Sequence, residues 1–177
     1  MARQIALLRG INVGGSKKVA MATLRELFAE LGFTDVKTYV NSGNVVFSGR
    51  EATAREIEEA IAATFGFDVA VVLRTRDELA AVVAANPLGD RATNPSRYLV
   101  LFSGGGPIDV ARADGVVPGE GESYEIVGRE AYLWLPDGVH ASPLAKGLTE
   151  KRLGVAPLTA RNWRTVEKLL ALCDQAA

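Results

Sequence analysis

Apolar residues follow two different spacings along the first half of the chain. Four short runs rich in apolar and β-branched residues are typical of strands and cover residues 4–9, 36–40, 45–47 and 69–74. Two longer segments, 21–31 and 53–65, place an apolar residue at every third or fourth position, as an amphipathic helix does. The predicted order is strand, helix, strand, strand, helix, strand, which is the order of a ferredoxin-like unit.

The second half of the chain repeats this order less clearly. Strands are predicted at 97–102, 124–127 and 131–135. The helical pattern is short at 107–112 and starts again at Pro143, behind Ser142 as an N-cap. It is strong at the end of the chain, where Thr159 is the expected N-cap of a helix that reaches Cys173.

A stretch rich in turn-forming residues separates the two halves. After a predicted helix at 77–85, residues 86–96 hold two prolines, a glycine and two asparagines, which is typical of a connector. We therefore expect a first half at 1–88, a second, looser half at 96–177, and a connector at 86–96. The fold class is α+β, with two ferredoxin-like halves of βαββαβ type whose antiparallel sheets pack into one compact unit.

Composition excludes several classes of protein. The 177 residues carry a net charge of −1, so a generally basic nucleic-acid binder is disfavoured. One cysteine excludes a disulfide framework and multi-cysteine zinc sites, and one histidine leaves too few imidazoles for most catalytic zinc sites. We expect neither a metal nor a cofactor. No apolar run approaches a membrane span and the first residues lack a leader pattern, so a cytoplasmic protein with no membrane partner is expected.

The neutral total hides a segregation of charge. Residues 1–25 hold five cations and no acid, and residues 140–168 hold six cations and two acids. Residues 107–137 hold seven acids and two cations. The basic segments either bind an external anion or are neutralised by the acidic segment, and the sequence leaves both open.

A glycine-rich loop occupies the position of a phosphate-binding loop, between a predicted strand and a predicted helix. From Gly10 to Lys18 it contains glycines whose backbone N–H groups can approach an anion. It lacks the Lys-Ser/Thr pair of a P-loop after Gly15, so a Walker-type NTPase is disfavoured. The alternative is a mobile loop with solvated lysines.

Cations crowd the predicted start of the terminal helix. Arg161, Arg164 and Lys168 would repel one another and oppose the helix dipole, an unfavourable effect of about 0.3–1 kcal/mol each. An incoming anion would explain this arrangement, and internal pairing of Arg161 with an acid is the alternative. We expect one basic cleft, formed by the Gly10–Lys18 loop and the Arg161–Lys168 helix start, that takes a phosphate-bearing small molecule or nucleotide. Its candidate ligand-binding residues are Arg9, Gly10, Asn12, Gly14, Gly15, Lys17, Ser42, Asn44, Arg161, Asn162 and Arg164.

Other functions remain open beside this one. Binding of a nucleic-acid backbone is less favoured, because the predicted central strands lack the aromatic residues on which bases stack. A structural or oligomerising module, or a transferase or hydrolase, is also compatible, and the oligomeric state is open. No catalytic residue stands out: Ser42 reads as a turn residue, His140 as a loop residue and Cys173 as core.

Several segments together resemble one bacterial family along essentially the whole chain. They are Ala6–Gly15, Tyr39 with Ser42–Phe47, Leu73–Thr75 with Glu78-Leu79, Asn86-Pro87 and Thr159–Val166. They are similar to the domain of unknown function 1697. The resemblance implies a compact α+β protein of two ferredoxin-like halves and implies no activity, substrate or cofactor. The chain departs from the expected pattern after Ser142, where Pro143 stands in place of a basic residue.

Overall fold

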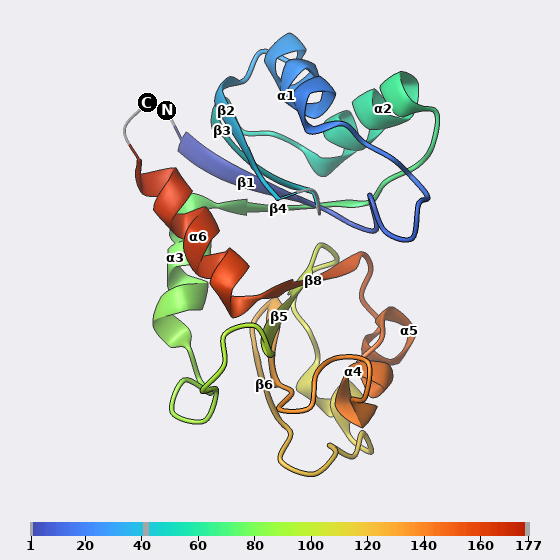
Figure 1. Ribbon diagram of the computed structural model, residues 1–177, viewed down its shortest axis with the longest axis vertical. Coiled ribbons are helices and arrows are strands. Elements are labelled where there is room, and N and C mark those ends of the chain that lie inside the picture. Colours follow the sequence, from blue (N-terminus) through green and yellow to red (C-terminus); the bar gives the residue numbers. More distant parts are fainter. Residues whose placement is uncertain (1, 41–42, 176–177) are drawn as a thin grey trace. The chain divides into compact units, whose positions relative to one another are not determined.

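Two four-stranded antiparallel sheets form the framework of the protein, seen in a computed structural model that describes residues 2–40 and 43–175 (Figure 1). The chain divides into two compact units. Unit 1 comprises Met1–Ala80 and Lys168–Ala177, and unit 2 comprises Ala81–Glu167. Both boundaries fall inside helices, so the units divide the chain differently from the expected halves.

Unit 1 has the predicted ferredoxin-like order of elements. They are β1 (Ala2–Leu8), α1 (Met21–Glu30), β2 (Thr34–Tyr39), β3 (Asn44–Gly49), α2 (Ala54–Phe65) and β4 (Val71–Thr75), followed by α3 (Arg76–Ala85), which crosses into unit 2. The strand order is β2-β3-β1-β4 and every neighbouring pair is antiparallel. Because side chains alternate between the faces of a strand, every second residue of β1 and β3 packs under α1 and α2 (Figure 1).

Local signals set the ends of the helices in unit 1. Thr53 and Glu56 form a capping box at the start of α2, and Arg50 hydrogen-bonds Glu56, which lowers the pKa of that carboxyl to about 2. At the end of α1, Gly32 adopts a φ of +94°, the left-handed conformation that glycine allows at little cost. The core between sheet and helices includes Phe47, whose ring lies 5.0 Å from that of Phe28.

Unit 2 repeats the same topology with shorter helices. Its elements are β5 (Tyr98–Ser103), η1 (Val110–Ala113), β6 (Ser123–Val127), β7 (Glu130–Trp134), α4 (Pro143–Gly147), α5 (Glu150–Leu153) and β8 (Leu158–Asn162), followed by α6 (Trp163–Asp174), which ends in unit 1. The strand order is β6-β7-β5-β8, again fully antiparallel. The helix expected at 107–112 is only one 3₁₀ turn, because this segment lacks the apolar spacing of a longer helix. Two ferredoxin-like sheets confirm the predicted fold class.

The terminal helix begins later than the sequence pattern predicts. Residues 158–162 form β8, which pairs with β5 in the register Val100↔Arg161. The helix starts at Trp163, and Asn162 is its N-cap, since its Oδ1 accepts a hydrogen bond of 2.9 Å from the backbone N–H of Thr165. The prediction of Thr159 as N-cap is therefore wrong. Arg161 lies on a strand and not in the first turn of a helix.

Candidate functional site

The loop from Gly10 to Lys18 is a small hairpin between β1 and α1. Val13 and Ser16 face each other as a β-bridge, and the turn between them consists of Gly14 and Gly15 with φ of +62° and +78°. Two consecutive positive φ values require the conformational freedom of glycine, as in a type I′ turn. The glycines therefore serve a tight turn, which differs from the arrangement of a P-loop.

Asn12 closes the base of this hairpin. Its side-chain Nδ2 donates to the carbonyl of Val19 at 3.0 Å, and its Oδ1 accepts from the N–H of the same residue at 2.9 Å. Lys17 is also tied to the backbone, because its Nζ donates to the carbonyl of Asp68 at 2.8 Å. Two residues predicted to contact a ligand thus hold the loop in place.

A surface hollow of about 530 Å³ lies beside the loop, at the start of α1. We call it the loop hollow; its lining residues are Asn12, Gly15, Lys18, Val19, Ala20 and Met21. The N-cap of α1 is Ala20, which has no capping side chain, and the first turn holds no acid. A helix start of this kind presents N–H groups and a partial positive charge to an anion.

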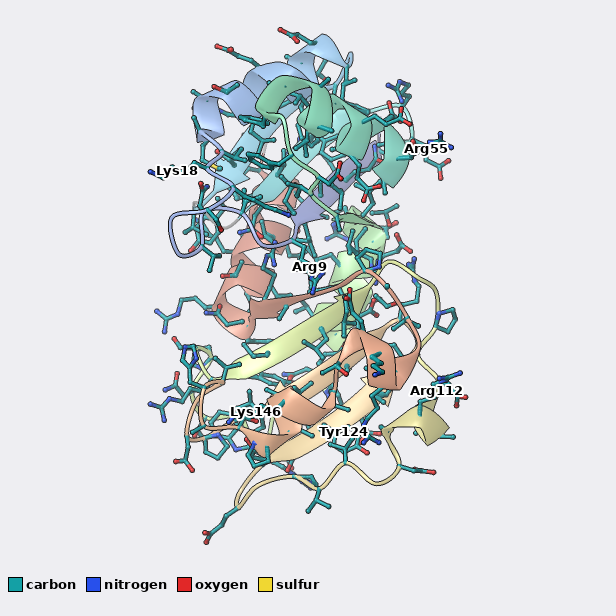
Figure 2. All side chains as sticks on the ribbon, turned by 90° about the vertical axis from the view of Figure 1, so that its right-hand side faces the viewer. Arg9, Lys18, Arg55, Arg112, Tyr124 and Lys146 are labelled. Carbon is teal, nitrogen blue, oxygen red and sulfur yellow. The ribbon has the colours of Figure 1, made fainter. Side chains whose placement is uncertain are left out.

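Charge at the loop hollow comes from Lys18. Its side chain is exposed, reaches into solvent in Figure 2, and has no carboxylate partner among the described residues. Arg9 and Gly10 are exposed just after β1, where the backbone N–H of Arg9 donates to the carbonyl of Ala70 at 2.9 Å. The loop hollow is therefore open and carries positive charge.

Two candidate ligand-binding residues, Ser42 and Asn44, lie just before or at the start of β3, and Asn44 has a structural role. Asn44 is completely buried, and its Nδ2 donates to the carbonyl of Tyr39 at 2.9 Å across the β2–β3 turn. Ser42, the other candidate, lies outside the described residues.

In unit 2 the three candidates at the start of α6 have three different environments. Arg161 is only 8% exposed, and its Nη1 donates to Thr159 Oγ1 and to the carbonyl of Ala160. Burial lowers the pKa of Arg161 to about 10, because a low-dielectric surrounding disfavours the charged form. Asn162 uses its side chain as a helix cap, whereas Arg164 is exposed.

The structure adds a second buried arginine that the sequence analysis did not select. Arg74 on β4 is 2% exposed, and its Nη1 donates to the carbonyl of Leu73, as Arg161 does to that of Ala160. Each arginine is the last residue but one of the fourth strand of its unit, directly before the residue that caps the next helix. The signal in the sequence is an arginine followed by Thr or Asn in front of a helical pattern, at Arg74-Thr75 and Arg161-Asn162.

The structure also contains a second and more strongly charged hollow that the sequence analysis did not predict. It measures about 610 Å³, lies in unit 2, and contains no candidate residue. We call it the cationic hollow; its lining residues are Arg112, Lys146, Gly147, Thr149, Lys151 and Arg152. The available signal was the basic composition of residues 140–168, but Arg112 comes from the acidic segment and joins the others only through the fold.

The cysteine is buried, and the described residues hold no metal-binding cluster. Cys173 is buried, as predicted, and burial raises the pKa of its thiol to about 11, so the reactive thiolate is scarce at neutral pH. Within residues 2–40 and 43–175, no three His, Cys, Asp or Glu side chains are grouped to hold a metal ion. In the same ranges, no helix combines the length and apolar character needed to cross a membrane.

Comparison with known proteins identifies the family. A family model described as "Protein of unknown function (DUF1697)" matches residues 1–132. The chain belongs to this family. That assignment confirms the resemblance found in the sequence, and the DUF1697 description names no activity. No curated protein matches the chain.

A solved structure extends the likeness of this DUF1697 chain beyond residue 132. The conserved bacterial protein SP0830 from Streptococcus pneumoniae is 26% identical in sequence, and the two structures superpose with a TM-score of 0.75. The match covers 98% of this chain and 99% of the other. The fold of both ferredoxin-like units is therefore shared with that protein.

Proposed function

We propose that this protein binds a phosphate-bearing small molecule or nucleotide, and that the loop hollow of unit 1 receives its phosphate group. The observation that carries this is the start of α1, where no side chain caps the helix and no acid stands in the first turn. Uncapped N–H groups together with the nearby ammonium of Lys18 favour a doubly charged oxyanion. A volume of about 530 Å³ suits a small ligand.

Ala20 gives a sharp test, because it is the N-cap of α1 and also lines the hollow. An Ala20→Asp substitution should cap the helix and stabilise the free protein by about 1 kcal/mol. The same carboxylate would occupy the position of the ligand's phosphate and repel it. We therefore expect a higher melting temperature and a loss of phosphate binding in one variant, a combination that general damage to the fold cannot produce.

Binding is measured by calorimetric titration with inorganic phosphate, a nucleoside monophosphate and a sugar phosphate. Lys18→Gln should weaken binding about three- to tenfold, and Arg55→Gln, a matched loss of one exposed cation on α2, should leave it unchanged. Saturable binding that Ala20→Asp abolishes supports the proposal. Binding that survives both Ala20→Asp and Lys18→Gln, or no binding by the natural sequence, refutes it.

A further inference from the structure

Four cations from three separate segments of unit 2 line the cationic hollow. Arg112 comes from η1, Lys146 from α4, and Lys151 and Arg152 from α5. Figure 2 labels Arg112 on the η1 turn and Lys146 on α4 of this unit. The other two lining residues, Gly147 and Thr149, carry no charge.

The positive charge of this hollow is not neutralised by the described part of the chain. None of the four cations has a carboxylate oxygen within 4.0 Å in residues 2–40 and 43–175. Two acids of these segments bond to backbone N–H groups: Glu150 accepts from Leu158 at 2.8 Å, and Asp109 accepts from Ala111 at 3.0 Å. Like charges gathered without counter-charges are unfavourable, so their grouping points to an external anion.

Close backbone approaches hold the three segments together. A Cβ on Gly147 would lie 2.7 Å from Cγ1 of Val116, so glycine lets the end of α4 approach the segment after η1. A Cβ on Gly154 would lie 2.8 Å from Cζ of Arg112, so that guanidinium rests against the backbone after α5. These approaches bring the backbone of the three segments together, so the cations that they carry surround one hollow.

We propose that the cationic hollow binds a chain of two or three linked phosphate groups, free or as part of a nucleotide. Two guanidinium groups can each take two phosphate oxygens, and two ammonium groups supply point charges around them. Two bidentate guanidinium groups use the four oxygens of a single phosphate group, so a linked chain gives the two ammonium groups oxygens of their own. The lining residues include no aromatic side chain on which a base could stack, which favours the phosphate chain over single-stranded nucleic acid.

The test is a calorimetric titration with inorganic tripolyphosphate, pyrophosphate and orthophosphate at low and physiological salt. Tripolyphosphate should bind at least tenfold more tightly than orthophosphate. Arg152→Gln and Lys146→Gln should each weaken tripolyphosphate binding three- to tenfold, since both side chains are exposed and neither holds an element together through a strong contact. Arg55→Gln is the matched control in unit 1 and should change the affinity less than twofold.

Further ligands separate the possible sources of the phosphate chain. ATP that binds about as tightly as tripolyphosphate, with AMP far weaker, shows that the phosphate chain itself is recognised. Equal affinities for tripolyphosphate and orthophosphate, or no effect of Arg152→Gln and Lys146→Gln, would overturn the proposal. A short single-stranded RNA that displaces tripolyphosphate at lower concentration, with a steeper dependence on salt, would overturn it in favour of a nucleic-acid backbone. The substitution Ala20→Asp, in the other unit, should leave this binding intact, so the two sites can fail independently.

Discussion

Single polar side chains around the glycine-rich loop are engaged with backbone groups. Asn12 and Lys17 bond to the backbone of Val19 and Asp68, and Asn44 bonds to that of Tyr39. A buried polar group without a partner costs about 1–3 kcal/mol, so the fully buried Asn44 needs the bond that it makes to Tyr39. Asparagine and glycine in a loop are therefore typical both of a turn and of an anion site, and the sequence alone does not separate the two.

Gly43 allows a prediction about a single residue. Its φ is +87°, and a Cβ would lie 2.7 Å from Cβ of Leu8 and 3.0 Å from Cδ1 of Ile11. Because both strain and a clash result, Gly43→Ala should destabilise the protein by about 2–4 kcal/mol in urea unfolding.

Gly10 provides the matched control for Gly43. It has a φ of +70° but open space around the position of a Cβ, so Gly10→Ala should cost only about 1 kcal/mol. Equal losses for the two variants would show that backbone conformation, and not the contact with Leu8 and Ile11, decides the stability.

Among the elements, the junction of β8 and α6 is where sequence and structure differ most. Thr159 and Arg161 share one face of β8 and are both buried, so the strand lacks the apolar alternation that identifies strands elsewhere in the chain. The polar residues of β8 instead resemble the first turn of the amphipathic helix that follows. Burial of a charged side chain depends on its tertiary surroundings, which local periodicity does not contain.

The observed N-cap leads to a prediction for α6. Asn162→Ala should lower the free energy of unfolding by about 1 kcal/mol, because the N–H of Thr165 loses its acceptor. Asn162→Ser can still cap the helix and should retain most of the stability. If serine is as damaging as alanine in urea unfolding, the asparagine has a role other than capping.

At the scale of the whole molecule, the end of the chain belongs to the unit that contains its beginning. Leu169 and Cys173 on α6 are 1% and 5% exposed, and the carbonyl of Leu172 accepts a hydrogen bond of 3.2 Å from Arg3. Unit 1 is thus completed by residues about ninety positions away from its main segment. The sequence analysis placed residues 168–177 in the expected second half, 96–177, because turn-rich stretches were the only boundary signal in the sequence.

Removal of residues 168–177 tests this division. The shortened chain loses two buried apolar side chains, each worth about 1.5–3 kcal/mol, so its unfolding midpoint in urea should fall substantially. Hydrogen exchange should rise first in β1 and β4, within unit 1. Arg76→Gln removes only exposed ion pairs, with Asp174 and Asp77, and serves as the control, with little expected change. Exchange that rises only in unit 2 would contradict the observed division.

The sequence by itself determined the strands other than β8, most helices, the ferredoxin-like order of the first half and the family resemblance. Those features arise from the spacing of apolar residues and from caps and turns, which act over a few neighbouring positions. Only the tertiary structure decided that Arg161 and Arg74 are buried and that the last helix completes unit 1. It also brought Arg112 from an acidic segment beside Lys146, Lys151 and Arg152. These outcomes depend on which distant segments pack together, and no local pattern in the chain records that.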